Sequence, residues 1–254
     1  MGCSDSSLSH ACRDQNWEKA KKLIVEDPER CYYSGAIDSA AHYMVSHSNV
    51  KMLQFMYDAI MASPSHTWYE LTRAFDNCDD DEDLDTPMAW AISAENMNCV
   101  KWLADHLYEP GQIFTARAYE GRYMTYAHLA ANRCRMKALD FIVKNSSEGG
   151  SILEVKDGKG NTPAHLSDCT PFTLEYFVRH APSGTGILFM RNAWGQTPID
   201  IADRNGRGGS LYFTPQKIAE LDAELHERLV RSEKQVEIPP PYPEKRADSS
   251  PAIC

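Results

Sequence analysis

Three histidines recur in similar local sequence and are the residues best suited to proton transfer or metal binding. His42, His128 and His165 each follow a serine or threonine by three positions. An imidazole can act as a general base or bind a metal ion near neutral pH. A zinc site, however, needs paired ligands at short spacing, and common catalytic sites carry a phosphate loop, a nucleophile elbow or a kinase signature. The sequence contains none of these, so we expect no catalytic residue, no metal and no cofactor.

The acidic run at residues 76–85 (DNCDDDEDLD) is the other candidate for metal chemistry. A calcium-binding EF-hand requires glycine at its sixth position and a distant glutamate, and this run lacks that frame. We therefore expect a solvated loop. A docking surface for a basic partner is the alternative.

Composition limits the class of protein. The eight cysteines include no C-x-x-C pair, which favours reduced thiols in a cytosolic protein. The formal net charge of -10 argues against electrostatic binding of nucleic acid by the chain as a whole. No apolar run approaches the roughly 20 residues of a membrane-spanning helix, and the N-terminus shows no secretory signal.

A short pattern repeats along the chain and predicts pairs of helices. Thr86–Ala91, Thr162–Ser167 and Thr197–Ala202 begin with Thr-Pro, and weaker copies lie at Thr125–Ala130 and Ser39–Met44. Threonine or serine can cap a helix, and proline fits the first helical position without losing a hydrogen bond. Apolar residues at helical spacing follow each copy after a brief turn. Each copy therefore predicts a short first helix and a longer second one.

This pattern resembles the ankyrin signature T-P-L-H-x-A. The residues at its last small position give the register, and the first two of them lie 33 residues apart, which is the ankyrin period. These register residues are Ala11, Met44, Ala91, Ala130, Ser167 and Ala202. The resemblance implies an all-α fold: an ankyrin-repeat solenoid of about six helical hairpins with a C-terminal capping helix. It covers residues 7–234, with insertion loops at about 62–85 and 108–122.

Two copies depart from the pattern. In the fifth, we expect the first helix to end early, at Asp168-Cys169, and the second to restart at Thr170-Pro171. In the sixth, a long helix after Thr214-Pro215 should run roughly to Lys234 and cap the stack. Terminal repeats are often atypical because their outer face meets water.

The resemblance also assigns roles to residues. The repeated histidines become structural, with each imidazole bonding across neighbouring loops, and Ala89 and Asp200 replace the histidine in two copies. Ankyrin partners usually lie against the loop tips and the concave face of the first helices. The expected partner-binding residues are Trp90, Ser93, Ala94, Asn132, Arg133 and Trp194.

The first six residues resemble the start of dually acylated signalling proteins. Gly2 and Cys3 follow the initiator methionine, and Ser6 stands where the myristoylation pattern requires serine or threonine. One myristoyl chain binds membranes only marginally, so palmitate on Cys3 would supply the second signal. We expect residues 1–6 to be an acylation signal. An unmodified N-terminus is the alternative.

Residues 235–254 form a proline-rich tail that we expect to be disordered. Pro239, Pro240 and Tyr242 fit the P-P-x-Y ligand of WW domains, which grip preformed polyproline segments in aromatic grooves. A tail with no binding role is the alternative.

The sequence predicts a non-enzymatic adaptor or scaffold. It would bind a protein partner through its repeats and a WW-domain protein through its tail, and it would be tethered by acylation to the cytoplasmic side of a membrane, without binding nucleic acid. One alternative is a regulatory or inhibitory subunit that occludes an enzyme and needs a single partner. The other is a purely soluble cytosolic scaffold. The fold by itself supports no function more specific than protein binding.

Overall fold

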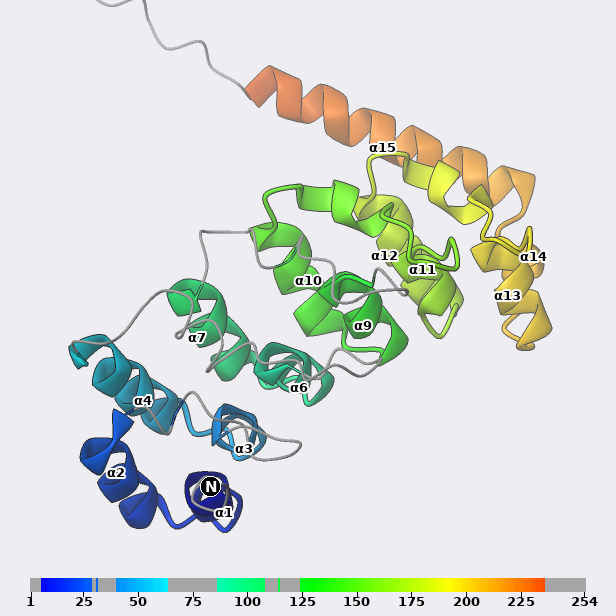
Figure 1. Ribbon diagram of the computed structural model, residues 1–254. Helices are drawn as coiled ribbons and strands as arrows, with labels where there is room; N and C mark the ends of the chain where they lie inside the picture. The colour runs from blue at the N-terminus through cyan, green and yellow to red at the C-terminus, as the bar shows by residue number, and fades with distance from the viewer. Residues whose placement is uncertain are drawn as a thin grey trace, which may run out of the picture.

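The computed structural model describes residues 6–28, 31, 40–63, 86–107, 114 and 124–235. Every element within these residues is an α-helix or a 3-10 helix, and none is a strand, which confirms the predicted all-α class. The helices lie in a curved row that begins with α1 and α2 and ends with α13 and α14 (Figure 1). None of the described helices is both long enough and apolar enough to cross a membrane.

Most helices come in sequential pairs with a short first member. The elements are α1 Ser6–Arg13, α2 Trp17–Glu26, α3 Ala40–Ser46, α4 Val50–Ala62, α6 Pro87–Ser93, α7 Met97–Leu107, α9 Tyr126–Asn132, α10 Met136–Asn145, η2 Gly149–Leu153, α11 Pro163–Leu166, α12 Pro171–His180, η3 Gly184–Phe189, α13 Pro198–Arg204, α14 Gly209–Tyr212 and α15 Pro215–Gln235. First helices pack on first helices from α1 through α3, α6, α9 and α11 to α13. Second helices α2, α4, α7 and α10 pack on one another in the same order. The molecule is therefore two layers of helices with a continuous core between them.

Threonine and proline start the first helices as the sequence predicts. Proline is the first residue of α6, α11 and α13. In front of α6, the Thr86 hydroxyl accepts a hydrogen bond from the Ala89 N–H at 3.0 Å. Small residues at the register position allow the close approach of neighbouring helices, since Ala91, Ala130 and Ala202 are fully buried.

In the first five hairpins, the residue two positions before the second helix has a left-handed backbone conformation. Its φ lies between 50° and 56° at the non-glycine positions Gln15, Ser48, Glu95, Cys134 and Cys169. In the five copies other than the fifth, the N–H five residues after the register residue donates back to its carbonyl oxygen at 2.8 Å. These bonds join Asn16 to Ala11, Asn49 to Met44, Asn96 to Ala91, Arg135 to Ala130 and Arg207 to Ala202. The register taken from the sequence therefore marks one repeated structural position.

The fifth hairpin has the shorter first helix that the sequence predicts. Helix α11 has four residues and is followed by Ser167, whose hydroxyl donates to the Ala164 carbonyl at 2.9 Å and accepts from the Cys169 N–H at 3.1 Å. Thr170 then caps α12 by accepting from the Thr173 N–H. Serine at the register position replaces the backbone bond that closes the other turns.

Two 3-10 helices, η2 and η3, were not predicted. Each follows a second helix, begins at a glycine with positive φ (55° at Gly149, 56° at Gly184), and packs on the helix before it. Each buries an Ile-Leu pair, at residues 152–153 and 187–188. Of the two predicted insertion loops, most residues lie outside the described part. Phe114 is buried against Phe141, with ring centroids 5.9 Å apart, so it belongs to the core.

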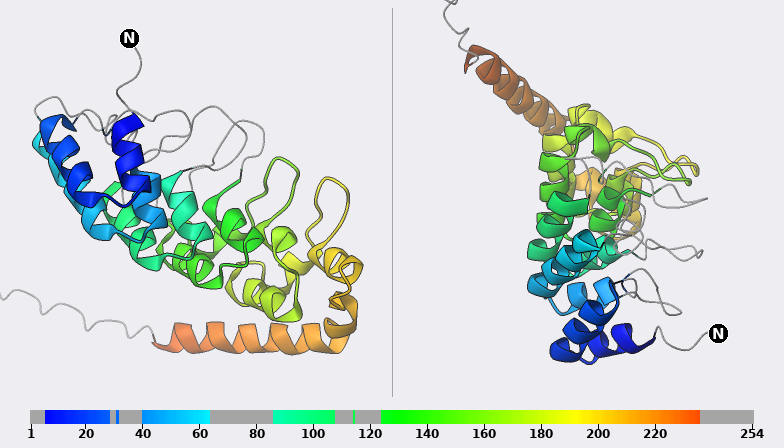
Figure 2. Two further views of the ribbon diagram at one scale, coloured as in Figure 1. Left: turned by 90° about the horizontal axis from the view of Figure 1, so that it is seen from below. Right: turned by 60° about the vertical axis from the view of Figure 1, so that its left-hand side comes forward.

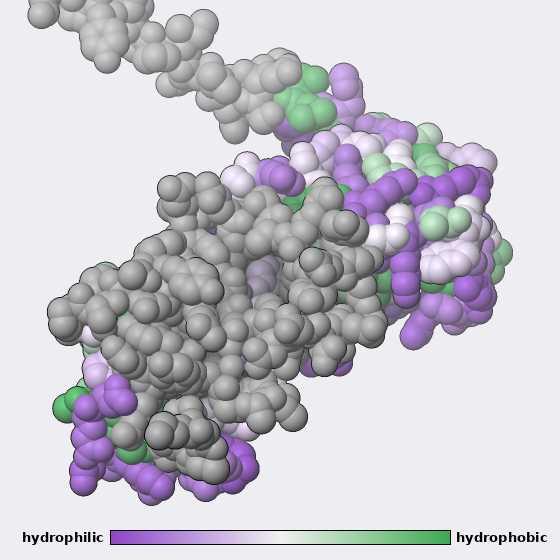
Figure 3. Space-filling model, viewed as in Figure 1, coloured by the Kyte–Doolittle hydropathy of each residue, from purple (hydrophilic) through white to green (hydrophobic). Residues whose placement is uncertain are grey.

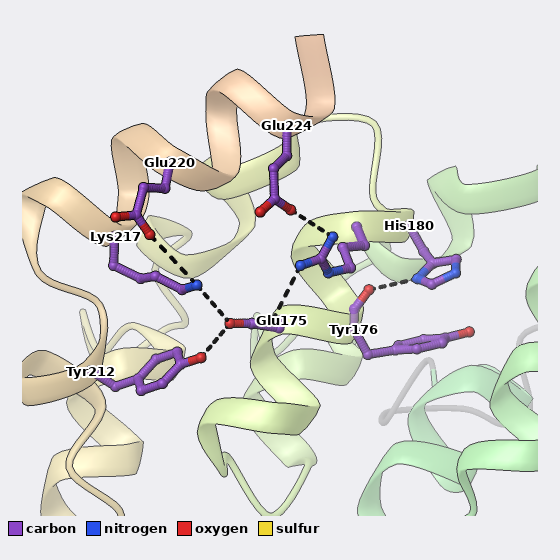
Figure 4. A network of polar contacts seen from close by, with 8 residues as sticks. Glu175, Tyr176, His180, Tyr212, Lys217, Glu220 and Glu224 are labelled. Atoms are coloured by element: carbon purple, nitrogen blue, oxygen red, sulfur yellow. Dashed lines mark hydrogen bonds and ion pairs between the residues drawn. The ribbon is translucent and has the colours of Figure 1, made fainter. Parts of the chain in front are cut away.

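Helix α15 packs against η3 through an apolar stripe and against α12 through charges. Leu221 is buried and Ile218 and Leu225 are partly buried. Figure 4 shows Glu175 of α12 at the centre of the polar contacts, with Lys217 of α15 as an ion-pair partner. Arg179, on the same helix as Glu175, is a second ion-pair partner. The helix ends at Gln235, close to the predicted end at Lys234.

Candidate binding pocket between two hairpin loops

Two loops of the same build project from one side of the helical row, ahead of α11 and α13 (Figure 2). In the first loop, the Asp157 Oδ1 atom accepts from the N–H groups of Lys159 at 2.8 Å and Asn161 at 2.7 Å. In the second, the Asn192 Oδ1 atom accepts from Trp194 and Gln196, both at 3.0 Å. A short acceptor side chain at the loop base thus organises each turn.

Glycine lets the two loops approach each other closely. Gly160 and Gly195 both have φ of 73°, and a Cβ atom on Gly160 would lie 2.9 Å from the Ala193 nitrogen. That nitrogen donates to the Lys159 carbonyl at 3.0 Å. At the base of the loops, the buried Asn192 side chain donates to the Asn161 side chain at 2.9 Å. The loops are therefore joined to each other and not only to their own helices.

The repeated histidines fasten these loops to the helices. The Nε2 atom of His128 bonds the Asn161 carbonyl at 3.0 Å, and that of His165 bonds the Gln196 carbonyl at 3.1 Å. Their Nδ1 atoms accept from the backbone N–H of Thr125 and Thr162, both at 3.1 Å. The expectation that imidazoles bond across neighbouring loops is confirmed for these two.

Both imidazoles are neutral, and both nitrogens of each ring take part in hydrogen bonds. Burial lowers the pKa of His128 and of His165, outweighing the hydrogen bonds that favour the charged form. Each ring has one nitrogen donating to a carbonyl and one accepting from an N–H, so neither nitrogen is available to a substrate or metal. His42 is also buried, with its ring 5.1 Å from that of Trp90.

Where the histidine is replaced, another group takes its role as the partner of the threonine. In the copy with Ala89, the Thr86 hydroxyl bonds the Tyr126 hydroxyl from the next first helix at 2.9 Å. In the last copy, the Asp200 carboxylate accepts from the Thr197 N–H at 2.8 Å, and this bond is the main cause that lowers the pKa of Asp200.

A pocket of about 390 Å³, which we term the loop pocket, lies between the two loops and helices α9, α11 and α13. Its lining is mixed: Trp194, Leu166 and Ile201 are apolar, while Asn132 and Gln196 carry side-chain amides. Lys159 and Arg204 add two positive charges. Trp194 is 63% exposed. Concave sites that mix apolar walls with a few polar groups are typical of ligand binding.

The pocket brings together two of the six predicted partner-binding residues, Asn132 and Trp194. Arg133 and Ala94 are exposed at the ends of first helices, outside the pocket. Ser93 is half-buried, and its carbonyl accepts from Arg135 Nε at 2.7 Å. Trp90 is half-buried and packs edge-to-face on His42 and Tyr43. For all six residues partner binding stays a prediction.

Two functional candidates, Lys159 and Arg204, were missed from the sequence. Lys159 stands in D-G-K-G-N at the position that Trp194 occupies in N-A-W-G-Q, so aligning the two loops would have identified it. Arg204 ends α13, and no sequence pattern distinguishes it from other surface cations. The predicted lipidation sites Gly2 and Cys3 and the tail residues Pro239, Pro240 and Tyr242 lie outside the described residues.

The described part of the chain shows no metal site, and its buried thiols are poor nucleophiles. No group of three histidine, cysteine, aspartate or glutamate side chains there could hold a metal ion. Burial raises the pKa of the Cys12 and Cys31 thiols to about 12, which leaves them protonated and unreactive. The surface seen in Figure 3 mixes hydrophilic and apolar residues at the C-terminal end.

No protein-family model matches the chain, and no curated protein does. Among solved structures, the chain is similar to one of the predatory endopeptidase Bd0816 from Bdellovibrio bacteriovorus in complex with the immunity protein Bd3460. The match has a TM-score of 0.55 and 14% sequence identity, and covers 86% of this chain and 99% of the matched chain. At this identity the likeness is one of fold.

Proposed function

We propose that this chain is an ankyrin-type solenoid of about six hairpins, ended by α15, that binds a protein partner and has no chemistry of its own. The recurring threonine caps, the left-handed turn residue and the cross-loop imidazoles all support the repeat assignment. Such stacks bury a shared core and leave their loops on one face for binding.

The single observation that carries this proposal is the loop pocket. Trp194 stands 63% exposed at its edge, on a loop that is held rigid by Asn192, by His165 and by the neighbouring loop. An exposed aromatic side chain on a rigid backbone loses little entropy on binding, and tryptophan is enriched among residues that dominate protein interfaces. The pocket is thus suited to receive side chains of a partner.

The titratable groups of the pocket support binding over catalysis. His165 has both ring nitrogens in hydrogen bonds, and the Asp157 carboxylate accepts from two backbone N–H groups and from the Asn161 amide. A general base must be free to reach the proton it removes. These two groups instead hold the loops in place.

A regulatory or inhibitory subunit is the second candidate. The observation that favours it is the similar structure, which holds an endopeptidase together with its immunity protein. A subunit of this kind would occlude its enzyme through the loop face and would need no further partner. The adaptor would need a second one.

The adaptor form of the proposal adds two features outside the described residues. Acylation at Gly2 and Cys3 would hold the protein at the cytoplasmic side of a membrane, and the Pro239–Tyr242 segment would bind a WW-domain protein. A Gly2→Ala variant should then move from the membrane fraction to the supernatant. Deletion of residues 236–254 should cost the adaptor one partner and leave an inhibitory subunit fully active.

The test of partner binding uses the full chain and two matched variants. We would capture partners from cells, identify them by mass spectrometry, and measure the dissociation constant of each with purified proteins. Trp194→Ala should weaken the true partner about tenfold or more. Phe172→Ala removes an aromatic ring that is 78% exposed on α12, outside the pocket lining, and should change nothing. Equal effects of the two substitutions would refute the loop pocket as the binding site.

A further inference from the structure

The loop pocket is positively charged in a chain whose net charge is -10. Lys159 and Arg204 line it, and neither forms an ion pair with any residue that the structure describes. Asp157 is the acidic residue of the lining, and three N–H groups already occupy its oxygens at 2.7 to 3.1 Å. The two cations are therefore left to a ligand.

Two acidic side chains of α13 lie near Arg204 in the sequence, and neither forms an ion pair with it. The Asp203 carboxylate accepts a hydrogen bond from the Ser210 N–H at 2.9 Å. Asp200 lies one helical turn before Arg204, and Arg204 contributes to lowering the pKa of Asp200. Its carboxylate, however, is taken up by the Thr197 N–H at 2.8 Å. Asp200 is not part of the pocket lining.

The remaining lining specifies more than an anion. Trp194, Leu166 and Ile201 offer apolar surface beside the cations, which suits an aliphatic or aromatic neighbour of the acidic group. The side-chain amides of Asn132 and Gln196 each combine a donor and an acceptor, which matches the N–H and C=O of a peptide backbone. A short peptide segment can contact the cations, the apolar side chains and the amides at once within a pocket of about 390 Å³.

We propose that the loop pocket recognises an acidic side chain of a partner protein, an aspartate or glutamate next to a large apolar residue, in an extended segment. Lys159 and Arg204 bind the carboxylate, the apolar neighbour packs on Trp194, and the amides of Asn132 and Gln196 bond the segment's backbone. Charge-assisted contacts of this kind give specificity and speed association. The proposal rests on protein binding through this pocket and names the chemistry of the partner.

The test is a selection with a displayed library of random 12-residue peptides, anchored at both ends so that every carboxylate is a side chain. Selection on the full-length wild type should enrich aspartate or glutamate beside an aliphatic or aromatic residue. A winning peptide should bind the Lys159→Gln, Arg204→Gln double variant at least tenfold more weakly, and its affinity should fall with added salt. Exchanging the charges, with Arg204→Glu against a lysine-bearing peptide, should restore binding.

Three outcomes would overturn the proposal, and they separate it from the proposed function. Peptides that depend on Trp194 but carry no acidic residue would leave the pocket a protein-binding site with different chemistry. Acidic peptides that bind Trp194→Ala and wild type equally would place recognition elsewhere on the surface. A selection that enriches no peptide, or none that depends on Trp194, would count against both the acidic partner and the binding function.

Discussion

Two groups of charged residues lie near the C-terminal end of the molecule, and they use their charges in opposite ways. In the first group, Lys217 contacts the Glu175 carboxylate at 3.5 Å (Figure 4). Arg179 contacts the same carboxylate at 3.4 Å and that of Glu224 at 2.9 Å. Around the loop pocket, Lys159 and Arg204 have no such partners in the described chain.

The first group is structural. Although burial raises the pKa of Glu175, the hydrogen bond from Tyr212 and the cations Lys217 and Arg179 hold it below its ordinary value. The carboxylate thus stays charged and joins α12 to α14 and α15. In the pocket, the charges join no two elements of the fold. The difference teaches that a charge committed to the fold and a charge available to a partner can be told apart by their contacts.

The largest effect should come from the imidazole that holds the pocket together. His165→Ala removes the acceptor for the Thr162 N–H and the donor to the Gln196 carbonyl, and leaves a small cavity. We expect the free energy of unfolding to fall by about 3 kcal/mol, because buried polar groups lose their partners. Urea denaturation of wild type and variant measures this change in the free energy of unfolding. A loss below about 1 kcal/mol would show that the cross-loop bonds do not support the fold.

Acidification should weaken the pocket framework while the Glu175 group is still charged. The folded-state pKa of His128 and of His165 is depressed from 6.5, so their contribution is present above pH 6.5 and is lost as the pH falls toward their folded values. We expect the free energy of unfolding to fall between pH 6.5 and pH 5, by at most about 1.4 kcal/mol per pH unit for each of the two groups. The double variant His128→Gln, His165→Gln should be flatter over this range. If the free energy of unfolding changed equally steeply with pH in wild type and variant, titratable groups other than these two histidines would cause the pH dependence.

Glu175→Ala should destabilise the fold by about 1.5 kcal/mol, because it removes charge-assisted hydrogen bonds at a side chain that is only 19% exposed. Partner affinity should stay unchanged. Thermal and urea unfolding check the first expectation, and calorimetric binding checks the second. Glu175→Gln provides the control, since it keeps an oxygen for the Tyr212 hydroxyl and should recover part of the stability. A loss of partner affinity without a loss of stability would mean that Glu175 serves partner binding and not the fold.

The smallest effect on stability should come from the pocket cations. Lys159→Gln with Arg204→Gln should change the free energy of unfolding by less than about 0.5 kcal/mol, because neither cation has an ion-pair partner among described residues. The measurement is the same denaturation series. A loss as large as that of Glu175→Ala would mean that these charges also belong to the fold.

The repeat and its register could be predicted because they depend on local rules. Thr-Pro starts α6, α11 and α13, and the early end of α11 follows from Thr170-Pro171. The 3-10 helices were missed because five or six residues with one Ile-Leu pair show no periodicity. The hairpin turns gave little signal, since left-handed positions such as Gln15 and Cys134 carry no glycine.

Only part of the pocket could be predicted. Trp194 and Asn132 followed from the resemblance of the sequence to ankyrin repeats, which places partners against the loops and first helices, and both line the pocket. Lys159 and Arg204 depend on two loops meeting, through the Ala193 N–H and the Lys159 carbonyl, and on where α13 then lies. Those are tertiary contacts between residues more than 30 positions apart, and no local pattern encodes them.

The most direct test of the account is hydrogen exchange on the full chain, with and without the partner protein identified by the capture experiment. We predict that protection appears at residues 157–166 and 192–204, the two loops and the helices that line the pocket. Protection should be absent at residues 171–180 and 215–235, where the charges are used internally. Protection confined to α12 and α15, with the two loops unchanged, would contradict the account and move the binding site to the other charged group.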